Sequence, residues 1–183
     1  MNIITKNRTQ QMLISSLLIA IGIMIPLVMP IKVIIGPASY TLASHVPIFL
    51  GLFISPFVAL SVTAGTTIGF LLAGFPLIIV LRALSHFLFV LFALFLIKSF
   101  KINQLSFAKQ APFYFLINVV HGLGEVLAVY LFSVTAQTTN TEGFYYTLWV
   151  LVGFGTIIHG FIDYALAHLI FDRIKVRHSE DVI

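Results

Sequence analysis

Long apolar runs dominate the chain, and short polar stretches divide them. A run of about 20 apolar residues is long enough to cross the hydrocarbon core of a bilayer as a helix, and the pattern predicts six such helices. Their approximate ranges are 11–29, 40–54, 57–74, 77–97, 112–134 and 145–170. Between the first two, the Gly and Pro residues of 30–41 predict a loop. We therefore expect an all-α integral membrane protein that forms a single membrane domain, residues 1–183.

The second and third of these helices come from one apolar stretch, 42–74, which could cross once or turn back as a hairpin. Charge decides between the two, because cytoplasmic ends are enriched in Lys and Arg. If the chain turns near Pro56, eight of the ten basic residues fall on one side, namely Lys6, Arg8, Lys98, Lys101, Lys109, Arg173, Lys175 and Arg177. Lys32 then lies outside and Arg82 within the membrane. The pattern predicts the hairpin, six transmembrane helices, and N and C termini that are both cytoplasmic.

Composition excludes a water-soluble fold. Only 9% of the residues are charged and 60% are apolar, whereas a soluble domain carries about 25% charged residues. The formal net charge of +4 is then a sign of orientation in the lipid bilayer, and we expect no nucleic-acid partner. Because cysteine is absent, there is no thiolate metal site. The Gly-x-x-x-x-Gly-Lys-Ser/Thr motif is also absent, so we expect no ATP hydrolysis and no cofactor in this chain.

Ionisable groups inside a bilayer cost about 2.5–3.5 kcal/mol each, so their presence marks a candidate site. Counting the helical rise of 1.5 Å per residue places seven polar or aromatic residues in the outer half of the bundle: Tyr40, His45, Arg82, His86, Glu125, Tyr146 and Trp149. A pocket of this kind suits a small, flat anion, since Arg binds a carboxylate through a fork of N–H groups and an aromatic wall stacks on a heteroaromatic ring. We predict that these seven residues bind the substrate. The alternative that Arg82 pairs with Glu125 stays open.

Two segments, His121–Glu125 and His159–Asp163, share the pattern His-Gly-x-x-acid. They could supply four ligands to a metal ion, but their helices run antiparallel and the count places both segments in the inner half, at different depths. We interpret the repeat as coincidence and expect no metal site. A relay of these residues would suit a stand-alone proton-coupled carrier of a small organic anion, and an intramembrane metal enzyme is a third possibility. The hydrolase motifs His-Glu-x-x-His and Gly-x-Ser-x-Gly are absent, so we predict no enzyme.

Small residues four positions apart allow two helices to approach closely. The first helix carries Ser16-Leu-Leu-Ile-Ala20, and the third carries Gly65-Thr-Thr-Ile-Gly69. Most such patterns pack helices within one chain. Because this chain lacks a motor of its own, Ser16 and Ala20 are also candidates for docking a partner.

The whole chain resembles the substrate-binding (S) components of energy-coupling-factor (ECF) vitamin transporters. The resemblance is carried by the size, the six helices, the missing ATP motif and the sequence of residues 36–56, 65–76 and 82–86. Within residues 36–86 it is most similar to the niacin-specific type. The ECF docking motif is Ala-x-x-x-Ala, and here Ser16 replaces the first alanine.

The resemblance implies a multi-pass protein of the bacterial cell membrane that captures its vitamin from outside with high affinity. It would deliver the vitamin inside together with a transmembrane coupling protein and two cytoplasmic ATPases, which use ATP. Nicotinate is the favoured substrate. Its carboxylate would contact Arg82, and its ring nitrogen would take a donor such as His45 or His86. An S component for another vitamin is the alternative within this class.

Overall fold

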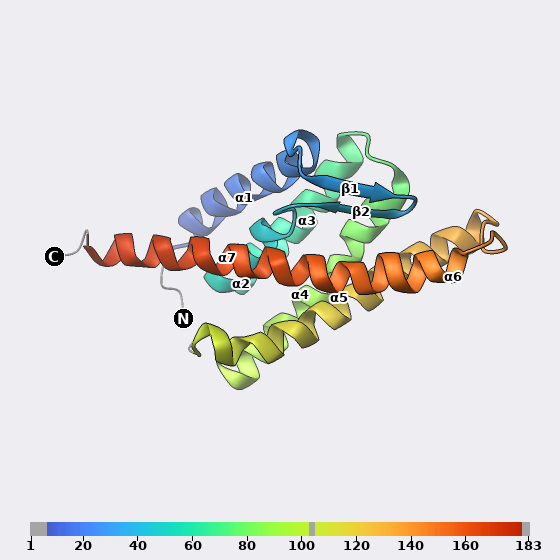
Figure 1. Ribbon diagram of the computed structural model, residues 1–183. Coiled ribbons are helices and arrows are strands. Elements are labelled where there is room, and N and C mark those ends of the chain that lie inside the picture. The colour runs from blue at the N-terminus through green and yellow to red at the C-terminus, as the bar shows by residue number, and fades with distance from the viewer. Residues whose placement is uncertain (1–6, 103–104, 181–183) are drawn as a thin grey trace.

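The protein is a bundle of long helices with one small β-hairpin (Figure 1), and the computed structural model describes residues 7–102 and 105–180. The elements are α1 (Arg8–Val28), β1 (Lys32–Ile35), β2 (Ala38–Thr41), α2 (Val46–Ile54), α3 (Pro56–Leu72), α4 (Leu77–Phe100), α5 (Phe107–Thr135), α6 (Phe144–Tyr146), the π-helical segment η2 (Thr147–Phe154) and α7 (Gly155–Glu180). In the described part, four helical stretches are long and apolar enough to cross a membrane: α1, α4, α5 and the continuous stretch Phe144–Ile174. The apolar helix α3 is shorter. The chain is a helical membrane protein.

Part of the segment 30–41, predicted as a loop, folds into a β-hairpin. Strand β1 pairs antiparallel with β2, with Val33 opposite Tyr40. Gly36 opens the two-residue turn at φ 57°, and hairpin turns of this length favour glycine where φ is positive. The loop prediction was wrong because Gly36 and Pro37 mark only the turn. The β-branched residues around them, such as Val33 and Thr41, favour strands.

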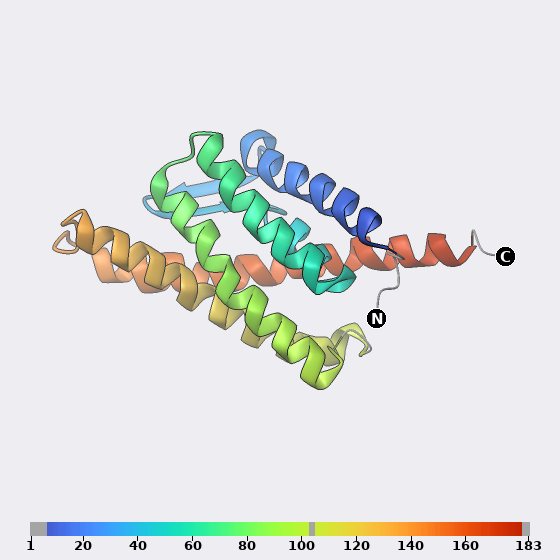
Figure 2. The ribbon, with the colours of Figure 1, turned by 180° about the vertical axis from the view of Figure 1, so that it is seen from behind.

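The helix predicted from residue 40 begins at Val46, because β2 extends to Thr41 and a turn with Ala43 at φ 69° follows it. All nine residues of α2 are buried. At 1.5 Å per residue α2 is only about 14 Å long. The chain then turns sharply, since Ser55 caps α3 by accepting a hydrogen bond from the Val58 N–H (3.2 Å). Helix α2 itself runs back from the hairpin toward the end of the bundle at which α1 begins (Figure 2), and α3 leaves from there.

Two kinds of packing hold the bundle together. Helix α1 lies against α3 because Gly65 and Gly69 leave room for Ile19 and Ile23, whose side chains a Cβ at either glycine would overlap. An aromatic core joins α2, α5 and α7, with the rings of Tyr114 and Tyr164 stacked at a centroid distance of 3.7 Å. This core fixes the start of α2 beside α5 and α7, where the polar residues gather.

The connections lie at two opposite ends of the bundle. The start of α1, the end of α7 and the α4–α5 turn lie at one end, whereas the β-hairpin, the α3–α4 turn and the α5–α6 connection lie at the other (Figures 1 and 2). The long helices therefore alternate in direction along the chain.

Candidate functional site

A cavity of about 500 Å³ lies beneath the β-hairpin, between α1, α2, α3 and α4. Its polar lining includes Lys32 of β1, Ser39 of β2 and three residues predicted for the site: His45, Arg82 and His86. Glu125 of α5, also predicted, completes this side. Phe70 and Phe75 form an aromatic part of the wall, with their ring centroids 4.7 Å apart.

Arg82, buried on α4, directs all of its N–H groups to protein acceptors. Its Nε and Nη2 donate to Glu125 Oε2 at 3.1 and 2.7 Å. Nη1 donates to the Pro37 carbonyl at 2.8 Å and to Ser39 Oγ at 2.9 Å, and Nη2 also donates to the Ser39 carbonyl at 3.2 Å. A guanidinium has five N–H groups, so these bonds satisfy it completely. The pairing with Glu125 that the sequence left open is present, and Arg82 also ties the β-hairpin to α4.

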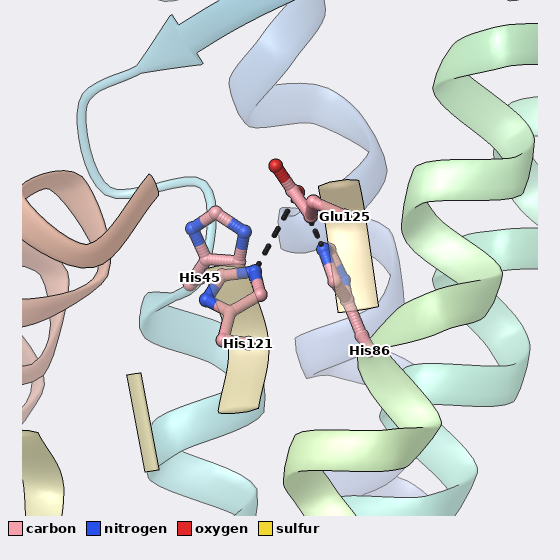
Figure 3. A group of neighbouring side chains, drawn as sticks. All are labelled: His45, His86, His121 and Glu125. Atoms are coloured by element: carbon pink, nitrogen blue, oxygen red, sulfur yellow. Dashed lines mark hydrogen bonds and ion pairs between the residues drawn. The ribbon is translucent and has the colours of Figure 1, made fainter. Parts of the chain in front are cut away.

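Glu125 joins three helices through its two carboxylate oxygens. Oε2 holds Arg82 and also accepts a hydrogen bond from Thr156 Oγ1 of α7 at 2.6 Å. Oε1 lies 3.3 Å from His86 Nε2 and 3.5 Å from His121 Nε2. Figure 3 shows His86 and His121 pointing toward this carboxylate from α4 and α5, with His45 beside them.

Asp163, predicted in the inner half of the bundle, is completely buried. Its oxygens accept hydrogen bonds from the backbone N–H groups of Ala43 (2.8 Å) and His45 (2.9 Å) and lie 3.1 Å from His45 Nδ1. His159 Nε2 is 3.3 Å from the same carboxylate. The ring of His45 in turn lies 4.6–5.0 Å, between centroids, from the rings of His86, His121 and His159.

The predicted separation into an outer and an inner group of residues was therefore wrong. His121, His159 and Asp163 lie in one buried cluster with His45, His86 and Glu125. The count measured depth along each helix separately, so it could not show that His45, at the start of α2, lies beside His121 of α5 and His159 of α7.

The two His-Gly-x-x-acid segments both direct their histidine and their acid to this cluster. The glycines let α5 pack closely against η2 and α7: a Cβ at Gly122 would lie 2.8 Å from the carbonyl oxygen of Gly153 in η2, and one at Gly160 of α7 would overlap the Asn118 side chain. The pattern thus combines a polar pair on one helix face with a glycine that allows close helix packing.

Tyr40 acts outside the cavity. Its hydroxyl donates a hydrogen bond to the Leu151 carbonyl of η2, where the π-helical pitch disturbs the regular backbone pairing. Burial raises the pKa of the Tyr40 phenol, which keeps the proton that it donates. Trp149 and Tyr146 do not join the other predicted residues, because their side chains are 53% and 62% exposed on the outer surface of the bundle.

Sequence reasoning missed Lys32, Phe70 and Phe75 as residues that line the cavity. Lys32 had a signal of its own, since it was the one basic residue that the predicted topology placed outside the membrane. The two phenylalanines lie within the stretch 65–76 that carried the family resemblance, but no periodicity distinguishes them from the other apolar residues there.

The candidate docking residues Ser16 and Ala20 are exposed on the surface of α1. The Ser16 hydroxyl donates to the Met12 carbonyl of its own helix at 3.0 Å. The opposite face of α1, with Ser15, Leu18 and Gly22, is the buried one. The small-residue pair is therefore free of the packing between α1 and α3.

Several apolar helices, with a partly polar cavity enclosed under a hairpin, are the architecture of a multi-pass membrane protein. The chain is 35% identical over 162 residues to the niacin transporter NiaX of Lactococcus lactis subsp. cremoris (strain MG1363), a match that covers 88% of this chain and 73% of the relative. The chain belongs to the family of NiaX niacin transporters. This confirms the predicted resemblance to the niacin-specific type, and the chain is a transport protein rather than an enzyme. No family model matches the chain, and no solved structure matches it.

Proposed function

We propose that the chain is the S component of an ECF transporter for niacin in the cell membrane. It captures nicotinate from outside and delivers it inside together with a transmembrane coupling protein and two cytoplasmic ATPases. ATP is used by these partners, and the chain itself needs no cofactor. The observation that carries the proposal is the 35% identity to a niacin transporter across 88% of the chain.

The proposed topology has six passes and cytoplasmic termini. The arrangement of the element ends supports it, because the start of α1, the end of α7 and the α4–α5 turn share one end of the bundle. Arg8 begins α1 and Lys98 lies in the last turn of α4, whereas Lys32 lies in the hairpin at the opposite end. Basic residues mark the cytoplasmic side, so the hairpin and the cavity beneath it face outward. Helix α2 serves as a short, fully buried pass.

The cavity suits nicotinate in size and chemistry. Its volume of about 500 Å³ lies within the range of small-molecule sites, and Phe70 and Phe75 offer an aromatic wall for a pyridine ring. Arg82 faces the cavity, but Glu125 balances its charge. Lys32 has no ion pair among the described residues, so in this proposal it attracts the carboxylate together with Arg82. Of the two predicted histidines, His86, which lines the cavity, is the proposed donor for the ring nitrogen, because the proton of a neutral His45 ring is directed to Asp163 (3.1 Å).

Calorimetry on the purified chain in detergent tests the proposal. We expect saturable binding of one nicotinate per chain, with weaker binding of nicotinamide, which lacks the carboxylate. Lys32→Gln should weaken nicotinate binding about tenfold, equivalent to roughly 1.4 kcal/mol, and leave nicotinamide binding unchanged. Lys98→Gln, at the far end of α4, is the matched control. Tight binding of a different vitamin would show that this vitamin, and not nicotinate, is the substrate. Binding of no vitamin would contradict the S-component assignment.

The buried network from Asp163 through His45 to Glu125 favours a second candidate, a proton-coupled carrier of an organic anion. Liposomes that contain only this chain separate the two functions. A carrier would accumulate nicotinate when a pH gradient is imposed. An S component would bind nicotinate but would not transport it without its partners, which is the result we expect.

A further inference from the structure

We propose that His45, His86, His121 and Glu125 form a binding site for one divalent transition-metal ion of the zinc or cobalt type. The site shares the wall of the cavity, and His86, with the niacin site proposed above, but it binds a different ligand. All four residues are buried, and each offers one ligand atom within 4.8 Å of the others. Figure 3 shows the four side chains, which come from the start of α2, from α4 and from α5, with His86 and His121 directed to Glu125 and His45 beside them.

Two of the distances between the ligand atoms match tetrahedral coordination, and all of them are below 4.8 Å. With bonds of about 2.0–2.1 Å, the ligand atoms of a tetrahedral zinc ion lie about 3.4 Å apart. His86 Nε2 and His121 Nε2 are 3.3 and 3.5 Å from Glu125 Oε1. Imidazole nitrogen and carboxylate oxygen are ligand types that suit zinc and cobalt.

His121 supplies an independent observation that points to a ligand. The residue is 1% exposed, and neither of its ring nitrogens has a hydrogen-bond partner of good geometry. A buried polar atom without a partner is rare in a native protein. A metal ion bound by Nε2 would satisfy one of these two nitrogens.

Asp163 positions His45 for this role. Its carboxylate lies 3.1 Å from His45 Nδ1, so the ring donates its proton there and keeps Nε2 as the nitrogen that can bind a metal. A histidine that ligates a metal commonly donates its other ring N–H to a carboxylate in this way. The second possible group, His45 with His159 and Asp163, is less suited, because both oxygens of Asp163 already accept hydrogen bonds from backbone N–H groups.

The balance of charge also calls for a further cation. The buried cluster contains two carboxylates, Glu125 and Asp163. Among the described residues that contact them, Arg82 alone carries a permanent positive charge. A metal ion shared by the histidines and Glu125 would supply the missing positive charge. A proton on one imidazole is the competing cation, and the experiment distinguishes them.

The test uses the full chain, purified in detergent with an affinity tag that contains no histidine and then stripped with EDTA. The stripped protein is incubated with Zn²⁺ or Co²⁺ and freed of excess ion. Bound metal is counted by mass spectrometry, and the visible spectrum of Co²⁺ reports its coordination. We expect one ion per chain and a tetrahedral Co²⁺ spectrum. Asp163→Asn should weaken metal affinity about 10–100-fold, as loss of an outer carboxylate does.

His121→Gln should abolish binding, whereas His168→Gln should not, because His168 pairs with Asp172 outside the cluster at 3.0 Å. If the wild-type chain retains no metal, or if His121→Gln retains as much as His168→Gln, the proposal fails and a proton is the balancing cation. The wild-type result decides even if a variant does not fold. Niacin binding is measured separately on the stripped chain, so failure of the metal site leaves the proposed function intact.

Discussion

At the scale of single residues, the buried pair of Arg82 and Glu125 makes the sharpest prediction on stability. Arg82→Gln leaves Glu125 buried without its charged partner. We expect the free energy of unfolding to fall by about 3–5 kcal/mol, as it does when one side of a buried ion pair is removed. The double variant Arg82→Gln/Glu125→Gln should cost less than Arg82→Gln alone, because no unpaired charge remains. Unfolding in detergent is the measurement, with Lys98→Gln as the exposed control. A cost below about 1 kcal/mol for Arg82→Gln would contradict this account.

The sequence identified the types of residue in the site better than their partners. The prediction brought together Arg82, His86, His45 and Glu125, because ionisable groups in an apolar helix are energetically costly and therefore mark a functional site. Their contacts depend on the rotation of each helix about its axis, which tertiary packing decides. The inclusion of His121 could not be foreseen, since it depends on the contact of its ring with His45 at the start of α2 (4.6 Å between centroids), and a count along α5 alone does not contain that contact.

At the scale of elements, the β-hairpin is held over the cavity by two anchors. Arg82 binds its turn, and Tyr40 binds the Leu151 carbonyl of η2. Removing the Tyr40 hydroxyl leaves that carbonyl without this donor, which costs about 1–3 kcal/mol in a buried place. We expect Tyr40→Phe to release bound nicotinate about tenfold faster, as measured by chase with unlabelled ligand.

Tyr145→Phe, on the exposed surface of α6, serves as the matched control for Tyr40→Phe and should leave the rate unchanged. Equal rates for both variants would show that the Tyr40 anchor does not hold the hairpin. Gly155 gives an independent check, because a Cβ there would overlap the Tyr40 ring. Gly155→Ala should therefore act in the same direction as Tyr40→Phe.

Long elements were predictable and short ones were not. Runs of about 20 apolar residues indicate membrane helices by length alone, and α1, α4 and α5 follow them closely. The strands have only four residues each, and α2 has nine. Such short segments are stabilised by contacts with distant parts of the chain, such as Arg82 with the hairpin turn, and a local pattern does not contain those contacts.

At the scale of the whole molecule, the proposed six-pass topology predicts which side of the membrane each loop faces. The chain contains no cysteine, so single cysteines can be introduced without removing any. Lys32→Cys should react with a membrane-impermeant maleimide added to intact cells, because the hairpin faces outward in the proposed topology. Lys101→Cys, in the α4–α5 turn, should react only after the membrane is opened. The reverse pattern would invert the orientation, and external labelling of both would contradict the six-pass count.

The exposed pair Ser16 and Ala20 carries the last prediction, which depends on the proposed ECF partnership. Small residues let another helix approach α1 closely, so Ala20→Phe should block docking while the cavity, on the other side of α1, stays intact. We expect the isolated variant to bind nicotinate with wild-type affinity. Uptake by cells that contain the coupling protein and the ATPases should fall about tenfold or more, because losing about 1.4 kcal/mol of docking free energy lowers the affinity for the partner tenfold. Ser99→Phe, at an exposed serine of α4, is the matched control. If Ala20→Phe transports as well as Ser99→Phe, α1 is not the docking face.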